Sequence, residues 1–141
     1  MKRKQKILAY ITRVRNGQHE LLVHKHKHQP EAGIQVVSGT VETGESLETT
    51  LFREILEEAG LKRIKLKKFL NTYTYYHPTK HKELERNVFW LEVTDQVPDE
   101  WEHEVEGSGN DKGLIFCWSW VPLHHHIELA ANHDDCLHLI R

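Results

Sequence analysis

The most informative region of this chain is residues 39–61, which read GTVETGESLETTLFREILEEAGL, with Gly39 first and Leu61 last. The region opens as a glycine-containing loop and continues with helical periodicity over residues 46–59. Apolar residues recur on one face of that segment, Ser46 can cap its start, and Gly60 can end it. We therefore predict an amphipathic helix that follows a loop and packs its apolar face against a core.

The polar face of this helix carries three carboxylates at close spacing. Glu54, Glu57 and Glu58 stand at positions i, i+3 and i+4, so they converge on one side of the helix. A cation among them would relieve their repulsion, and all-oxygen ligands suit Mg²⁺ or Mn²⁺. Such an ion can bridge phosphate oxygens and lower the pKa of a bound water. The alternative is an ordinary solvated helix face, on which Arg53 and Glu57 form a surface pair.

The spacing of the charged residues and glycines is specific. The stretch matches all nine positions of the pattern G-x5-E-x7-R-E-U-x-E-E-x-G-U, in which U is a bulky apolar residue, here Ile55 and Leu61. A chance match of this length is rare, so the motif resembles the Nudix box of the Nudix hydrolases. The resemblance at the level of the motif covers residues 39–61.

The resemblance implies a reaction and roles for the matched residues. Nudix hydrolases split a nucleoside diphosphate linked to another moiety X, using water activated by a metal. By this resemblance Glu57 and Glu58 are the core metal ligands, and Glu54 is a further ligand or the group that accepts the proton of water. Arg53 is expected to orient the carboxylates, and Gly39 to offer its carbonyl to the metal.

A further carboxylate is expected outside the motif. The segment WEHEVE at residues 101–106 lies where some members of the family supply one, and Glu104 is our candidate metal ligand. An acidic exposed loop is the alternative interpretation of this segment.

Two polar clusters are candidate substrate contacts. His24 and His26 alternate with lysines near the end of a predicted strand, so they share one face and could contact phosphates. Together with His28 on the same face, they could also bind a transition metal, or form an exposed strand end. Tyr73 and Tyr75 share a face of another predicted strand and could stack on a base, the alternative being ordinary sheet packing.

The rest of the chain is predicted to form strands around the central helix, with a hairpin turn at Asn16-Gly17. A second helix is expected from Pro122 onward. We predict an α/β (α+β) fold in one domain, residues 1–141, built as a Nudix-type α/β/α sandwich with a mixed β-sheet between helices. The predicted strands are residues 6–15, 19–26, 34–37, 65–76, 87–93 and 114–121.

Composition limits the possible partners. The 141 residues carry 19 Lys and Arg against 21 Asp and Glu, a net charge of -2, so no basic field indicates nucleic acid or membrane. Two cysteines, Cys117 and Cys136, form no disulfide framework, and no early apolar run is long enough for a membrane span. We expect a cytoplasmic protein with a small nucleotide as its partner; the resemblance allows a homodimer.

The expected activity is that of a pyrophosphohydrolase dependent on Mg²⁺ or Mn²⁺. Its substrate would be a nucleoside triphosphate, a dinucleoside polyphosphate, a nucleotide sugar or a similar compound. The alternative is a Nudix-fold module that binds a nucleotide, or regulates, without cleaving it. Such modules usually lose carboxylates of the motif, whereas this chain keeps all of them.

Overall fold

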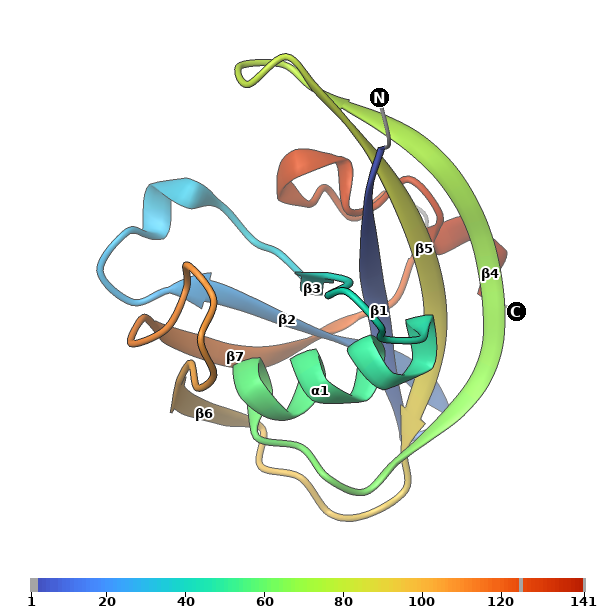
Figure 1. The fold of residues 1–141 in the computed structure, drawn as a ribbon. Coiled ribbons are helices and arrows are strands. Elements are labelled where there is room, and N and C mark those ends of the chain that lie inside the picture. Colours follow the sequence, from blue (N-terminus) through green and yellow to red (C-terminus); the bar gives the residue numbers. More distant parts are fainter. Residues whose placement is uncertain (1–2, 125, 141) are drawn as a thin grey trace.

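A computed structural model describes residues 3–124 and 126–140 as one curved mixed sheet with an α-helix on one face (Figure 1). No helix in this part of the chain is long and apolar enough to cross a membrane. The strands are β1 Lys4–Arg15, β2 Gln18–His26, β3 Val37–Thr40, β4 Ile64–His77, β5 Lys82–Val93, β6 Glu100–Glu104 and β7 Ile115–Pro122. The α-helix is α1 Leu47–Ala59. Three short 3₁₀ turns are η1 Pro30–Ala32, η2 Ala130–Asn132 and η3 Leu137–Leu139.

The strand β1 is the centre of the sheet. The order is β4-β5-β1-β2-β7-β6, and β3 pairs with β1 outside this path. The pair β1–β5 is parallel over residues 4–12 and 84–92, whereas the other pairs are antiparallel. Because β1 pairs with β3 through its first half and with β2 through its second half, β3 ends beside the start of β1.

The alternation of side chains along β1 divides the interior into two cores. Ile7 and Ile11 point toward α1 and pack with Leu51 and Ile55 of its apolar face. The even-numbered residues Leu8 and Tyr10 pack on the opposite face with Leu129 and Leu137 of the C-terminal segment. Figure 1 shows α1 in front of the sheet and the C-terminal segment behind it. The α+β class and the mixed sheet are therefore confirmed.

The expected second α-helix from Pro122 onward is wrong for the described residues, and residue 125 lies outside them. This segment holds only the 3₁₀ turns η2 and η3. Two of its backbone N–H groups bond to distant parts of the chain: Leu123 N–H donates to His19 O of β2 at 3.0 Å, and Ala130 N–H donates to Ile34 O, in the loop before β3, at 2.8 Å. The bonds within the segment close single turns between residues i and i−3, such as His133 N–H to Ala130 O at 3.1 Å. Helical spacing of apolar residues did not reveal these non-local partners.

Candidate functional site

The helix α1 has the boundaries that its sequence predicts. Ser46 Oγ accepts from Thr49 N–H at 3.1 Å, and Gly60 ends the helix in the left-handed region with φ +74°. The buried side chains Leu51 and Ile55 fix the rotation of the helix about its axis. That rotation directs the carboxylates of Glu54, Glu57 and Glu58 toward β3 and the loop after β6.

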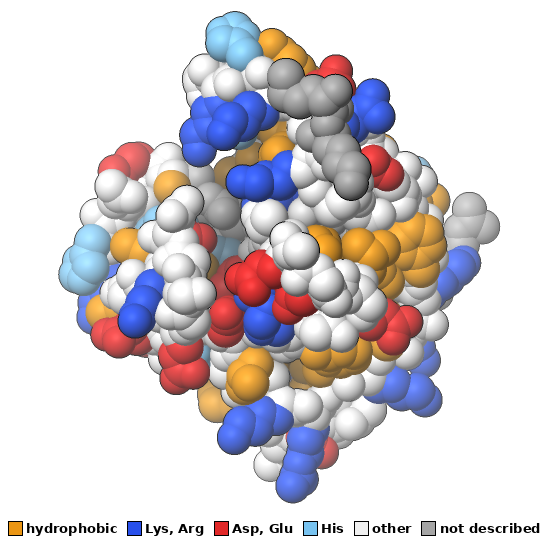
Figure 2. Space-filling view, in the orientation of Figure 1, with side chains coloured by type: hydrophobic (Ala, Val, Ile, Leu, Met, Phe, Trp, Pro, Cys, Tyr) orange, Lys and Arg blue, Asp and Glu red, His pale blue; other side chains and the backbone are white. Residues whose placement is uncertain are grey.

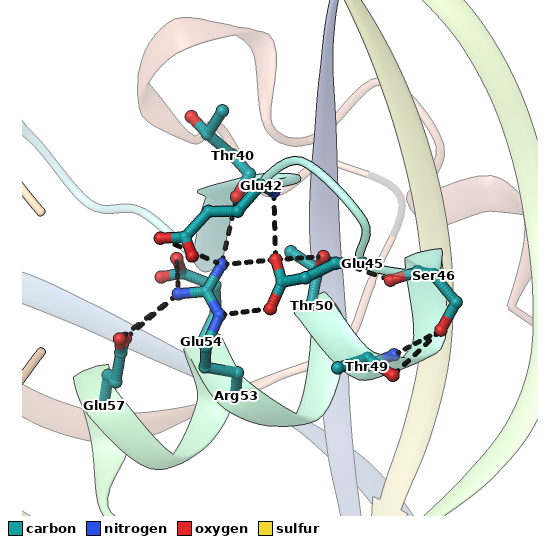
Figure 3. Close-up of polar contacts among 9 residues, drawn as sticks. All are labelled: Thr40, Glu42, Glu45, Ser46, Thr49, Thr50, Arg53, Glu54 and Glu57. Carbon is teal, nitrogen blue, oxygen red and sulfur yellow. Dashed lines mark hydrogen bonds and ion pairs between the residues drawn. The ribbon is translucent and has the colours of Figure 1, made fainter.

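A single guanidinium ties the loop to the helix (Figure 3). Arg53 donates to both carboxylate oxygens of Glu45, at 2.7 and 2.9 Å, and to Glu54 Oε1 at 2.9 Å. It also donates to Glu57 Oε2 at 3.1 Å and to the carbonyl of Thr40 at 3.1 Å. The bond from Arg53 lowers the pKa of Glu45 to about 2, so Glu45 stays ionised and fixes the loop.

Glu58 is the most buried of the three carboxylates. Burial raises its pKa well above the ordinary value, and the adjacent Glu54 carboxylate raises it further, while the Ser38 backbone amide acts in the opposite direction. Burial and the charge of Glu54 also raise the pKa of Glu57. Glu57 and Glu58 therefore hold protons more readily than isolated carboxylates do, and a cation bound beside them would lower their pKa values again.

Two glycines make room for these side chains. A Cβ atom on Gly39 would lie 2.1 Å from Glu54 Cδ, and a Cβ atom on Gly107 would lie 2.2 Å from Glu57 Oε1. Such distances are far below van der Waals contact, so a larger residue at either position would displace a carboxylate. Gly39 belongs to the motif, whereas Gly107 lies in the loop between β6 and β7.

The carboxylates form one wall of a cavity of about 360 Å³. Figure 2 shows acidic side chains gathered at a hollow in the middle of this face, with basic side chains around it. The other walls come from β1, β3, the turn between β4 and β5, and the loop between β6 and β7; they contribute Lys6, Lys80, Glu106 and Asp111. Sequence reasoning missed Lys6, Lys80 and Asp111 because they lie far from the motif along the chain, and it selected Glu104 instead of Glu106 within the segment 101–106.

The donor set fits a hard divalent cation in its chemistry. Glu54, Glu57 and Glu58 supply carboxylate oxygens only, as Mg²⁺ and Mn²⁺ prefer. Burial, and after it the nearby carboxylate of Glu54, raise the pKa values of Glu57 and Glu58, and a bound cation would oppose both effects. In this conformation Arg53 engages Glu54 and Glu57. Among residues 3–124 and 126–140, no group of three or more His, Cys, Asp or Glu side chains is already arranged around a metal position.

The family model of the NUDIX domain matches residues 4–140. The chain belongs to the NUDIX family. Curated relatives include two described as "NAD-capped RNA hydrolase NudC". The protein from Mannheimia succiniciproducens is 38% identical over 58 residues, and the one from Actinobacillus succinogenes is 41% identical over 58 residues. Each match covers 38% of this chain and 22% of the relative, so the chain spans about a fifth of the length of these relatives.

Solved NUDIX structures share the fold over 86% to 100% of this chain. The NUDIX domain of Shewanella oneidensis NrtR, complexed with ADP ribose, has a TM-score of 0.70 at 15% identity and covers 99% of this chain and 86% of that one. The MutT NUDIX hydrolase from Burkholderia pseudomallei has a TM-score of 0.67 at 21% identity and covers 100% of both chains. A C. elegans Ap4A hydrolase has a TM-score of 0.60 at 21% identity, with 86% and 82% covered.

Outside the NUDIX motif, Glu104 does not lie on the cavity. It is exposed at the end of β6, where it pairs with Ile115. The chain then turns, and Glu106 and Asp111 reach the cavity instead. Asp111 is close enough for its charge to raise the pKa of Glu58. The strand continues through Glu104 and leaves its side chain exposed, so the structure does not place this candidate metal ligand at the cavity.

The predicted histidine contacts are also absent from the cavity of this NUDIX domain. His24 is 1% exposed and lies between Phe116, at 4.2 Å between ring centroids, and Trp118, at 4.3 Å. Burial lowers its pKa to about 3, so it is neutral at pH 7. His26 stacks on Phe116 at 4.7 Å. Phe116 and Trp118 of β7 cover His24, whereas His26 is partly exposed and lines a separate cavity with Leu114 and Ile115. The structure therefore places neither histidine among the residues that line the carboxylate cavity.

Tyr73 and Tyr75 share a face, as predicted, but they surround Arg86. The guanidinium lies over the ring of Tyr75 at 3.7 Å and donates to Tyr73 Oη at 3.1 Å. It also donates to the carbonyl of Ala131 at 2.7 Å, which attaches the C-terminal segment to the sheet. Neither tyrosine lines the cavity, so both pack against Arg86 instead of forming an open stacking surface.

Proposed function

We propose that this chain is a pyrophosphohydrolase that requires Mg²⁺ or Mn²⁺ and cleaves the diphosphate bridge of a nucleoside diphosphate derivative. The observation that carries this proposal is the convergence of Arg53, Glu54, Glu57 and Glu58 on one wall of a cavity. Membership of the NUDIX family and the hydrolases among the matched proteins support the class of reaction.

Glu54, Glu57 and Glu58 would hold the metal, with the carbonyl of Gly39 as a further ligand. The bound metal would supply charge neutralisation at the phosphates and a lower pKa for water. Arg53 keeps two of these carboxylates at the cavity wall by direct hydrogen bonds. Glu54 lies beside Glu58 and is our candidate for accepting the proton of the attacking water, since a carboxylate there can act as a general base.

The proposed substrate is a small nucleotide in which a nucleoside diphosphate is linked to X. Matched proteins are described with ADP ribose, Ap4A and NAD-capped RNA, which share that chemical feature. A cavity of about 360 Å³ accommodates the diphosphate and part of a nucleoside. The cytoplasmic location and the homodimer stay predictions from the sequence.

The test is a hydrolysis screen with Mg²⁺ or Mn²⁺ at mildly alkaline pH. The panel comprises ADP-ribose, diadenosine tetraphosphate, nucleoside triphosphates and nucleotide sugars, and chromatography resolves the products. We expect cleavage that depends on metal, and a fall of about 1,000-fold in turnover for Glu57→Gln, because this change removes a charged metal ligand. Glu48→Gln is the matched control, since Glu48 is exposed on the first turn of α1.

Two results would contradict the proposal. Equal turnover in wild type and Glu57→Gln would remove Glu57 from the mechanism. Tight binding of a panel nucleotide with metal present and without product would favour the non-catalytic module.

A further inference from the structure

Lys6 brings a positive charge to the cavity from the strand β1. Its ammonium Nζ donates to Thr40 Oγ1 at 2.9 Å, across the pair of β1 with β3. The charges of Glu54 and Glu58 act on Lys6, and all three residues line the cavity. Within the described part of the chain, however, no carboxylate lies within ion-pair distance of Lys6.

The surroundings of Lys6 destabilise its positive charge, because its ammonium is partly buried and has Thr40 as its hydrogen-bond partner. Burial lowers the pKa of its ammonium, which means that the protein solvates the charge less well than water does. An ammonium carries three N–H donors, and Thr40 accepts one of them. The position is therefore suited to an anion that enters the cavity and accepts the remaining donors.

A second cation lies beside Lys6 on the same sheet face. Lys6 and Arg86 are directly opposite each other in the parallel pair of β1 and β5. Arg86 is 4% exposed, donates to uncharged groups, and likewise has no carboxylate partner among the described residues. Arg86 does not line the cavity, but its charge acts on Lys6 and adds to the positive potential there.

We propose that Lys6 binds a phosphate oxygen of the diphosphate bridge, on the side of the cavity opposite the carboxylates of α1, and so orients the bridge for attack. The inference rests on the proposed function, because it takes the diphosphate as the ligand. The carboxylates repel a phosphate, so a cation on the opposite wall is needed to hold the anion while the metal contacts it. Arg86 does not line the cavity and would attract the phosphate through its charge, without direct contact.

The experiment compares Lys6→Met, Lys6→Arg and Lys4→Met in the full chain. Lys4 is the matched control because it lies on the same face of β1, is exposed, and loses the same charge. We would measure kcat and KM with the substrate found in the screen, the affinity for α,β-methylene-ADP by calorimetry, and the affinity for Mn²⁺ alone by electron paramagnetic resonance.

For Lys6→Met we expect the affinity for α,β-methylene-ADP to fall about 10- to 100-fold, with KM rising in parallel, since a charge-assisted hydrogen bond is lost. The affinity for Mn²⁺ should stay equal or become tighter, because a positive charge near Glu54 and Glu58 is removed. Lys6→Arg should recover part of the analogue affinity. Lys4→Met should differ from wild type by less than about twofold.

Unchanged analogue affinity in Lys6→Met would overturn the inference. A parallel loss of analogue and Mn²⁺ affinity would also overturn it, because a merely structural role predicts that result. If Lys6→Met does not fold, Lys6→Gln replaces it under the same criteria. If wild type cleaves no nucleotide while binding of α,β-methylene-ADP still depends on Lys6, the proposed hydrolase fails and the phosphate contact stands.

Discussion

Two clusters of titratable side chains lie on the α1 side of the sheet, and they differ in what surrounds them. On α1, Arg53 joins Glu54 and Glu57 at the wall of a cavity. On β2, His24 and His26 lie against aromatic rings of β7. Both clusters look like sites from their spacing, because in each the side chains share one face.

The comparison shows that burial alone does not mark a functional group. Burial raises the pKa of Glu58 and lowers the pKa of His24, and both shifts favour the neutral form. The carboxylates of α1 line an open cavity, so a cation can enter it and stabilise their ionised form. The ring of His24 has Phe116 and Trp118 as neighbours and belongs to the core.

Apart from the loss of a metal ligand, the largest expected effect tests whether the charge of Arg53 holds the carboxylate cluster together. In Arg53→Met the hydrogen bonds to Glu45, Glu54 and Glu57 are lost, so the carboxylates move apart and the loop before α1 loosens. We expect turnover to fall about 100-fold, as a misplacement of about 1 Å can cause, while the chain stays folded. Steady-state kinetics and circular dichroism measure the two effects.

The matched control for this change is Arg63→Met. Arg63 is exposed and forms a long ion pair with Asp95 at 3.6 Å, so its loss should leave turnover within about twofold of wild type. Equal losses in the two variants would mean that net charge, and not the cluster around Arg53, controls activity.

The second prediction tests whether His24 is a core residue. Burial lowers the pKa of His24 to about 3 in the folded chain, against 6.5 for a solvated histidine, so the unfolded state binds more protons between these pH values. The free energy of unfolding of the wild type should therefore decrease as the pH falls from about 6.5 toward 3. At pH 5 the decrease caused by His24 is on the order of 2 kcal/mol. In His24→Leu this decrease should be absent, so chemical denaturation should show an unfolding free energy that depends less strongly on pH.

Exposed His28 provides the control, because His28→Leu should keep the wild-type dependence of unfolding free energy on pH. His24→Leu should also hydrolyse substrate at a rate within about threefold of wild type. A large rise in KM for His24→Leu would restore the interpretation of His24 as a phosphate contact.

The smallest expected effect separates two acidic residues, Glu104 at the end of β6 and Asp111 in the loop after β6. Glu104 is exposed and lies away from the cavity, so Glu104→Gln should change turnover by less than about twofold. Asp111 lines the cavity and acts on Glu58, so Asp111→Asn should lower the pKa of Glu58 and alter the affinity for Mn²⁺. Metal titrations of both variants, with kinetics, measure the contrast, and a larger effect from Glu104→Gln would reverse our assignment.

Local signals predicted the elements that depend on neighbouring residues. The helix starts after Ser46 and stops at Gly60 because both caps act within one turn. The hairpin turn at Asn16-Gly17 forms because both residues adopt positive φ, of 52° and 76°. The segment after Pro122 does not form the predicted α-helix: two of its N–H groups bond to distant residues, His19 on β2 and Ile34 in the loop before β3, and its local bonds close only single turns.

The sequence by itself determined the helix α1, its carboxylate face and the family, because these follow from spacing within residues 39–61. Only the tertiary structure decided which other polar side chains share the cavity. Lys6 and Asp111 reach it through the pairing of β1 with β3 and through the loop after β6, while β7 covers His24. Periodicity states which residues share a face, but strand order and register determine what that face meets.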